Sequence, residues 1–225
     1  MRSINLALLS SVFAASAFIL SWVAEFNCHF LKFTNAKPTI PPNVHFGIWA
    51  YQFWTTATNV DGTYIFETCH TYPDQTGSGA ILHVDSKWKA AKAFSVLTLI
   101  IGGVVFFSNM IRGCRPKYAE MLFVSRGEAV LYVLTSFFSG MTLIVLDSDL
   151  CKHNILMEEV DAASPNTEFG DTCEMSRGAK CVIAATVFWF CAGLTSYQGW
   201  KAEKEEAVPD TTVSLTDPLI AEDLS

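Results

Sequence analysis

Residues 94–111 of the chain have the sequence FSVLTLIIGGVVFFSNMI, which carries no charged side chain. A hydrocarbon core about 30 Å thick is crossed by a helix of roughly 20 apolar residues, within a range of about 17 to 25. Three further runs of this kind cover residues 4–23, 129–146 and 181–197. The sequence therefore predicts four membrane-spanning helices, the last one near the lower length limit.

A water-soluble helix bundle is the main alternative, and the pattern of polar residues argues against it. Helices that meet water carry a polar stripe at every third or fourth position. The polar residues of the run 94–111 are Ser95, Thr98, Ser108 and Asn109, which leaves most of its circumference apolar. The whole chain of 225 residues is 51% hydrophobic and 16% charged, with a positive mean hydropathy of +0.30. These values favour a lipid environment.

The run 4–23 has a second alternative, a cleavable signal peptide, because Ala15-Ser16-Ala17 resembles a cleavage site. The apolar core of a signal peptide is about 7 to 15 residues long. The run 4–23 is longer than that, so we expect it to remain as the first span.

The distribution of Lys and Arg predicts the topology, because basic residues near span ends stay in the cytoplasm. Residues 112–128 contain four basic residues in 17, against five in 70 for residues 24–93 and three in 34 for residues 147–180. We therefore expect 112–128 to be an inner loop, 24–93 and 147–180 to be outer loops, and both termini to be cytoplasmic. We expect the membrane to be the plasma membrane or an endomembrane.

The net charge of −7 arises mainly from acids in the second outer loop and in the tail. Residues 201–225 are polar and acidic with little to bury, which predicts a disordered cytoplasmic tail. The sequence shows no basic patch of the kind that binds nucleic acid. The expected partners are the lipid bilayer and other membrane proteins or further copies of this chain.

Four cysteines fall in the expected outer loops, where an oxidising environment favours disulfides. Of the three possible pairings we favour Cys28 with Cys69 and Cys151 with Cys173, because each bond closes one loop; four free thiols are the alternative. Cys114 differs, because it follows the second span on the expected cytoplasmic side, beside Arg112 and Arg115. It is a candidate palmitoylation site, with an unmodified thiol as the alternative.

Residues 46–58 and 63–72 are rich in aromatic and β-branched residues and flank Asp61-Gly62. An Asp-Gly turn between such runs predicts a β-hairpin. A turn centred there would pair Trp54 with Cys69 and Tyr51 with Tyr72. The expected fold class is an all-α membrane protein, a four-helix transmembrane bundle with a small antiparallel β-sheet in the first outer loop. Small residues on three spans predict close helix contacts; they are Ala7, Ser11 and Ala15, then Ser136 and Gly140, then Ala185, Ala192 and Ser196.

Groups that carry chemistry are absent from the interiors of the four runs, which contain no Asp, Glu, Lys, Arg or His. Ionisable groups inside a membrane mark proton relays and ion paths. His29 and His70 would approach each other if Cys28 bonds to Cys69, but sulfur in a disulfide is not a metal ligand. We therefore expect no catalytic residue, no cofactor and no metal.

The layout of spans and loops resembles the claudin and peripheral myelin protein superfamily. Gly47-Ile48-Trp49 resembles the Gly-Leu-Trp motif of that family's first outer loop, and Cys69 lies where its second loop cysteine is expected. Residues 87–94, KWKAAKAF, resemble the charged, Ala-rich entry to its second span. One departure is Gln52, at the place of the family's first loop cysteine, so the partner of Cys69 must be another cysteine.

The resemblance implies a non-enzymatic membrane protein whose outer loops make lateral or adhesive contacts. It also implies that Trp49 packs the first loop onto the bundle. Two alternatives remain open, an accessory subunit of a channel or transporter and a membrane enzyme that uses loop residues. A pore former would carry charged side chains along its path, and an enzyme would gather titratable groups in a pocket.

Overall fold

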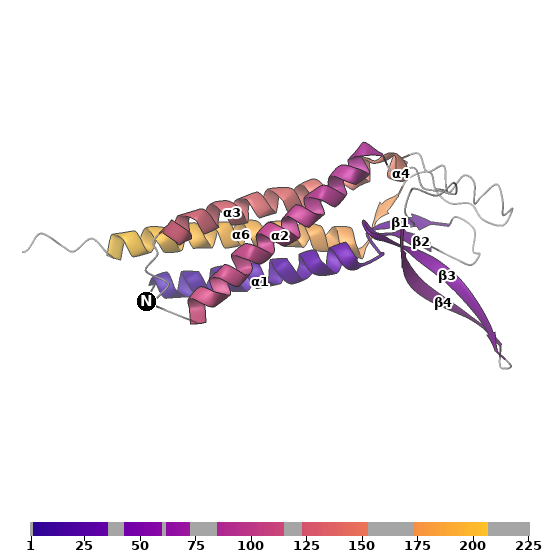
Figure 1. The fold of residues 1–225 in the computed structure, drawn as a ribbon, viewed down its shortest axis with the longest axis horizontal. Coiled ribbons are helices and arrows are strands. Elements are labelled where there is room, and N and C mark those ends of the chain that lie inside the picture. Colours follow the sequence, from indigo (N-terminus) through magenta and orange to yellow (C-terminus); the bar gives the residue numbers. More distant parts are fainter. Residues whose placement is uncertain are drawn as a thin grey trace, which may run out of the picture.

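The computed structural model describes residues 2–35, 43–59, 62–72, 85–114, 123–152 and 173–206. Within these ranges four helices are long and apolar enough to cross a membrane, as predicted. α1 packs against α6 and α2, and α3 packs against the same two helices (Figure 1). The helices are α1 (Arg2–Phe26), α2 (Ser86–Cys114), α3 (Phe123–Met141), which η2 (Thr142–Asp147) continues, and α6 (Arg177–Glu206).

The helices extend beyond the apolar runs that were predicted as spans. α2 begins at Ser86, ahead of the run 94–111, and α6 begins at Arg177, ahead of the run 181–197. Asp85 ends the preceding loop, because its Oδ1 accepts a 2.8 Å hydrogen bond from the backbone N–H of Trp88 and so caps α2. α6 continues to Glu206, so the first residues of the tail 201–225, for which disorder was expected, are helical. The rest of that tail lies outside the described residues.

An antiparallel sheet covers one end of the helices, which we call the sheet end (Figure 1). In the described part of the chain its order is β4-β3-β2-β1-β5. The prediction of a sheet is confirmed, but the sheet is not confined to the first loop, because β5 comes from the loop that precedes α6. The strands are β1 (Leu31–Thr34), β2 (Asn43–Phe46), β3 (Ala50–Asn59), β4 (Gly62–Thr71) and β5 (Glu174–Met175).

The predicted hairpin exists as β3 and β4, but the predicted register is wrong. Cys69 lies opposite Gln52 instead of Trp54, and Tyr51 lies opposite His70 instead of Tyr72. The two registers differ by two residues, so every side chain keeps its face. Tyr72 is held outside the ladder, because its hydroxyl donates a 2.8 Å hydrogen bond to the backbone oxygen of Gly47. Figure 1 shows the hairpin projecting away from the helices.

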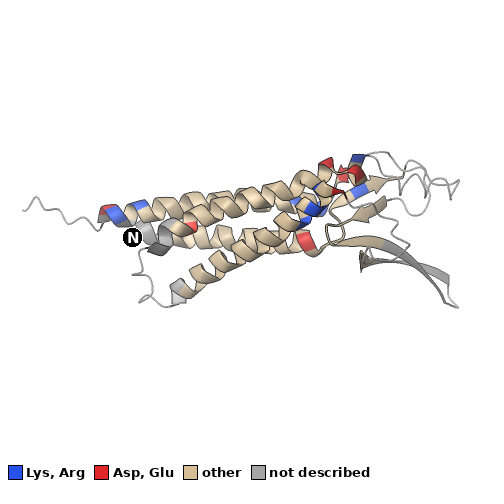
Figure 2. Ribbon diagram, turned by 45° about the horizontal axis from the view of Figure 1, so that its top comes forward, with Lys and Arg blue, Asp and Glu red and all other residues tan. Residues whose placement is uncertain are grey.

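Two buried clusters of apolar residues hold the molecule together. The sheet-end core joins strands to helix ends; among its residues are Phe30, Phe33, Phe46, Ile48, Trp88 and Val145. The mid-bundle core lies between the helices and consists of Ala14, Ala17, Val105, Tyr132, Ala185, Trp189 and Ala192. Figure 2 shows charged residues at the two ends of the helices and an uncharged stretch between them.

The small residues on α6 and α3 pack as predicted, whereas the predicted face of α1 is wrong. Ala185 and Ala192 are fully buried, and Ser136 Oγ donates a 2.9 Å hydrogen bond to the backbone oxygen of Thr186. The buried face of α1 is rotated away from Ala7, Ser11 and Ala15. Its buried residues are Ser10, Ala14, Ala17, Ser21, Ala24 and Glu25. Trp189 sets this rotation, because its Nε1 donates to Ser21 Oγ at 3.2 Å.

Candidate functional site

The turn Gly47-Ile48-Trp49 lies where the sheet meets the helices. A Cβ atom on Gly47 would lie 2.4 Å from the backbone oxygen of Asn27 and 2.8 Å from the Cα of Cys28. Both contacts are shorter than real Cβ atoms allow, so this position requires glycine. Ile48 is fully buried in the sheet-end core. The motif singled out from the sequence therefore brings the first loop into backbone contact with the end of α1.

Trp49 and Tyr72 fix this turn to α2 through a shared cation. Trp49 Nε1 donates a 3.2 Å hydrogen bond to Ser95 Oγ. The Nζ atom of Lys92 lies 5.0 Å from the ring centroid of Trp49 and 5.1 Å from that of Tyr72, which is within cation–π range. Burial raises the pKa of the Tyr72 hydroxyl, which keeps it a donor to Gly47. Lys92 is thus a structural link between α2 and the first loop.

The disulfide Cys28–Cys69 ties β4 to the end of α1, as favoured from the sequence. Gln52 lies opposite Cys69 in the β3–β4 ladder and is 4% exposed. Among the described residues, neither polar atom of its side chain has a hydrogen-bond partner. A buried carboxamide without partners costs about 1 to 3 kcal/mol, so Gln52 is a point of weakness beside the disulfide.

The second loop, between η2 and α6, joins the first loop along β1. The backbone N–H groups of Ser176 and Gly178 donate to the backbone oxygens of Phe30 and His29, at 3.0 and 2.8 Å. β5 pairs with β1, and Lys32 Nζ lies 3.9 Å from Glu174 Oε2 across that pair. The predicted disulfide Cys151–Cys173 holds the base of this loop closed.

Charged residues near the start of α2 hold the end of η2. Asp85 Oδ2 accepts a 3.0 Å hydrogen bond from the backbone N–H of Asp149, the first residue of α4 (Asp149–Lys152). Lys87 Nζ contacts Asp147 Oδ2 at 2.5 Å, and Lys152 contacts the other oxygen of the same carboxylate. Asp85 therefore caps both α2 and α4.

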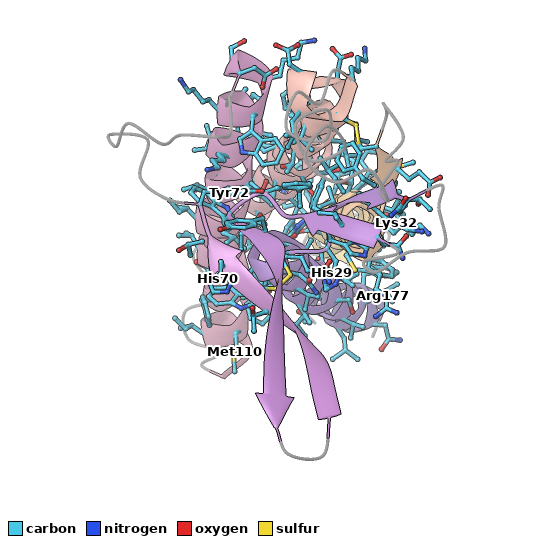
Figure 3. The ribbon with its side chains drawn as sticks, turned by 90° about the vertical axis from the view of Figure 1, so that its right-hand side faces the viewer. His29, Lys32, His70, Tyr72, Met110 and Arg177 are labelled. Atoms are coloured by element: carbon cyan, nitrogen blue, oxygen red, sulfur yellow. A yellow bond between two sulfur atoms is a disulfide. The ribbon has the colours of Figure 1, made fainter. Side chains whose placement is uncertain are left out.

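A histidine pair is the feature that the sequence did not predict. His29 and His45 have ring centroids 4.4 Å apart. His29 was expected beside His70, yet the ring contact of His70 is with Tyr51, at 6.2 Å. Figure 3 places His29, Lys32 and Arg177 on one side of the sheet base, with His70 and Tyr72 on the other. Strand β2 places His45 beside His29, and the local sequence did not predict that strand.

Two residues of the run 87–94 pack inside the protein. Trp88 is 1% exposed in the sheet-end core, and Lys92 contacts aromatic rings. The side chain of Cys114, the candidate palmitoylation site, lies outside the described residues.

No protein-family model matches the chain, and no curated protein matches it. Within the described residues, no group of three His, Cys, Asp or Glu side chains could hold a metal ion. The site combines a close glycine contact, a lysine between two rings, two disulfides and a histidine pair.

Proposed function

We propose that this chain is a claudin-like, non-enzymatic, multi-pass membrane protein whose first loop makes lateral or adhesive contacts with other membrane proteins or with further copies of the chain. Both termini lie in the cytoplasm, and the sheet lies on the outer side of the membrane. The observation that carries the proposal is the β3–β4 hairpin, a pair of ten-residue strands that projects away from helices to which its base is firmly fixed.

The base of the hairpin is rigid, which suits a binding element. The disulfide Cys28–Cys69, the Tyr72 hydrogen bond and the Lys92 contacts all act on residues at the base. Presentation on a fixed base lowers the entropy that binding must overcome. Within the described residues β4 is an edge strand, and a long edge strand offers unpaired backbone groups to a partner.

Shortening the hairpin tests the proposal without disturbing its base. Phe53 and Thr68 are cross-strand partners, so residues 54–67 can be replaced by Asn-Gly, which closes a two-residue turn. The full chain and the shortened chain are expressed on cells that do not otherwise adhere, and cell aggregation and chemical crosslinking are measured. We expect the shortened chain to reach the surface in equal amount and to lose both aggregation and crosslinking.

A chain that ends at Glu206 is the matched control, because it removes the tail and keeps the hairpin. It should aggregate and crosslink as the full chain does. Equal contacts by the full and shortened chains would contradict the proposal, as would a full chain that makes no contacts. Crosslinking of the full chain to a channel or transporter would favour an accessory subunit instead.

A further inference from the structure

The histidine pair sits at the joint between the two loops. His29 precedes β1 and His45 lies on β2, both in the first loop. Ser176, in the second loop, places its Oγ 3.2 Å from His45 Nδ1. Directly beside this contact, Ser176 and Gly178 bond to the backbone of the first loop. Electrostatic repulsion at His45 therefore acts directly on the contact between the loops.

Positive charge surrounds His45 on several elements. Lys32 on β1 is its direct cross-strand partner, and Arg177 at the start of α6 also acts on it electrostatically. Glu174 on β5 is the acid of the same row, opposite Lys32, and its contact with Lys32 is long at 3.9 Å. The formal charge of Lys32, Arg177 and Glu174 together is +1. Protonation of the His45 imidazole would raise the charge of the cluster to +2.

We propose that His45, packed against His29 and beside Ser176, forms an acid-sensitive lock, which holds the second loop against the first at neutral pH and releases it when the His45 imidazole is protonated. His29 Nδ1 donates to Asn27 Oδ1 at 2.7 Å, which holds the His29 ring beside His45. A proton on His45 therefore adds a positive charge next to that of Lys32, its cross-strand partner.

The direction of the pH effect follows from the environment of His45. Burial, followed by the charges of His29 and Lys32, lowers the pKa of His45 from its ordinary value of 6.5 to about 4. A group whose pKa is lowered in the closed state stabilises that state above its ordinary pKa, and this stabilisation is lost as pH falls. The contact between the loops should thus weaken from about pH 6.5 downward and stop weakening near pH 4.

Hydrogen exchange of the full chain in lipid nanodiscs tests the lock. Protection factors of peptides covering residues 29–34 and 173–180 are measured at pH 7.5 and pH 5.0, each relative to the intrinsic exchange rate at that pH. We expect a fall of about tenfold in both peptides, since one linked proton gives at most tenfold per pH unit and His45 is half exposed. Peptides from the middle of α6 should keep their protection.

Two histidine variants separate this lock from a general effect of acid. His45→Gln keeps a polar side chain near Ser176 and cannot be protonated, so the fall in protection between pH 7.5 and pH 5.0 should disappear. His70→Gln is the matched control, because His70 lies on β4 away from the second loop, and its fall should equal that of the unaltered chain. A fall that persists in His45→Gln, or that disappears in His70→Gln, would overturn the proposal.

Arg177→Gln provides an independent measurement if His45→Gln does not fold. The side chain of Arg177 is exposed, so its loss should not disturb packing. Removing one positive charge near His45 lowers the repulsion on protonation, and the fall in protection at pH 5.0 should become smaller. An unchanged or larger fall would contradict the lock.

Discussion

The sheet-end core and the mid-bundle core are held together by different interactions. Large aromatic and aliphatic side chains, two disulfides and a lysine between two rings hold the sheet end. Alanines and hydroxyl groups hold the described part of the bundle, together with ring pairs stacked between helices, among them Tyr132 on Trp189 at 5.8 Å. The first set suits water, where burial of apolar surface drives folding. The second suits lipid, where close backbone approach and buried hydrogen bonds take over.

Removal of the disulfide at the sheet end should have the largest effect. In the Cys28→Ser/Cys69→Ser variant we expect the free energy of unfolding to fall by about 2 to 5 kcal/mol, because the bond closes a long loop in the unfolded chain. Denaturant unfolding in detergent micelles measures the loss, and hydrogen exchange should place it in the sheet and not in the helices. Cys181→Ser, which removes a free thiol on α6, is the control and should change little. Loss of helix protection in the double variant would show that the two cores are not separate.

Moving the disulfide tests the resemblance to the claudin family. Gln52 lies opposite Cys69, and facing Cβ atoms in an antiparallel pair are about 4.5 to 5.5 Å apart, so a small approach of the two strands brings them to the roughly 3.5 to 4.5 Å of a disulfide. The Cys28→Ser/Gln52→Cys variant should therefore form a bond between positions 52 and 69, and it also removes the buried carboxamide. We expect it to be more stable than Cys28→Ser alone by about 2 kcal/mol. Mass spectrometry of the unreduced protein identifies the bond, and free thiols at both positions would contradict this prediction.

Trp49→Ala should have the next largest effect at the sheet end. The change removes the hydrogen bond to Ser95, one of the two rings that face Lys92 and packing against the sheet-end core. A buried tryptophan costs about 3 to 5 kcal/mol on truncation, and we expect about 3 here because the ring is partly exposed. Thermal melting in micelles measures the loss. Trp22→Ala, at the same end with a ring 52% exposed, is the control and should melt close to the unaltered chain.

Close packing in the middle of the bundle can be tested with two neighbouring glycines. A Cβ on Gly102 would lie 2.7 Å from Trp189 Cζ2, whereas a Cβ on Gly103 would lie 3.4 Å from Phe18 Cε2, an ordinary contact. Gly102→Ala should therefore destabilise the protein by about 1 to 3 kcal/mol. Gly103→Ala should be neutral or stabilising by up to about 1 kcal/mol, since alanine favours the helix. Equal melting temperatures for the two variants would show that the helices can shift apart without cost.

The helices and the disulfides could be predicted from the sequence because each rests on a local or a counted property. Apolar length finds a span, and two cysteines in each loop restrict the pairing. The start of α2 could not be predicted from apolar length. It depends on Asp85, which caps the helix, and on Lys87, which contacts Asp147. Strands β1 and β2 were missed because each has four residues and depends on contacts with distant parts of the chain.

The site was harder to predict, because its contacts join segments far apart in the sequence. Gly47, Trp49 and Cys69 were found by resemblance, but nothing in the sequence predicted that Lys92 lies against Trp49. The histidine pair depends on the pairing of β1 with β2, which brings His45 opposite Lys32. The hairpin register failed for a related reason, since Tyr72 and Cys69 are fixed by tertiary bonds and not by the turn.

Hydroxyl groups between helices should give the smallest effect, which makes them the strictest test of the comparison between the two cores. Ser136 Oγ donates to a backbone oxygen on another helix, whereas Ser11 Oγ donates at 3.0 Å to Ala7 on its own helix. In lipid an interhelical hydrogen bond contributes about 0.6 kcal/mol on average and at most about 1.7. Ser136→Ala should lose about this amount in a denaturation experiment in micelles, and Ser11→Ala should lose none. Both changes delete one oxygen from a helix. An equal loss of stability in the two variants would therefore mean that the hydrogen bond between helices contributes nothing. The bundle would then depend on its apolar faces, as a water-soluble core does.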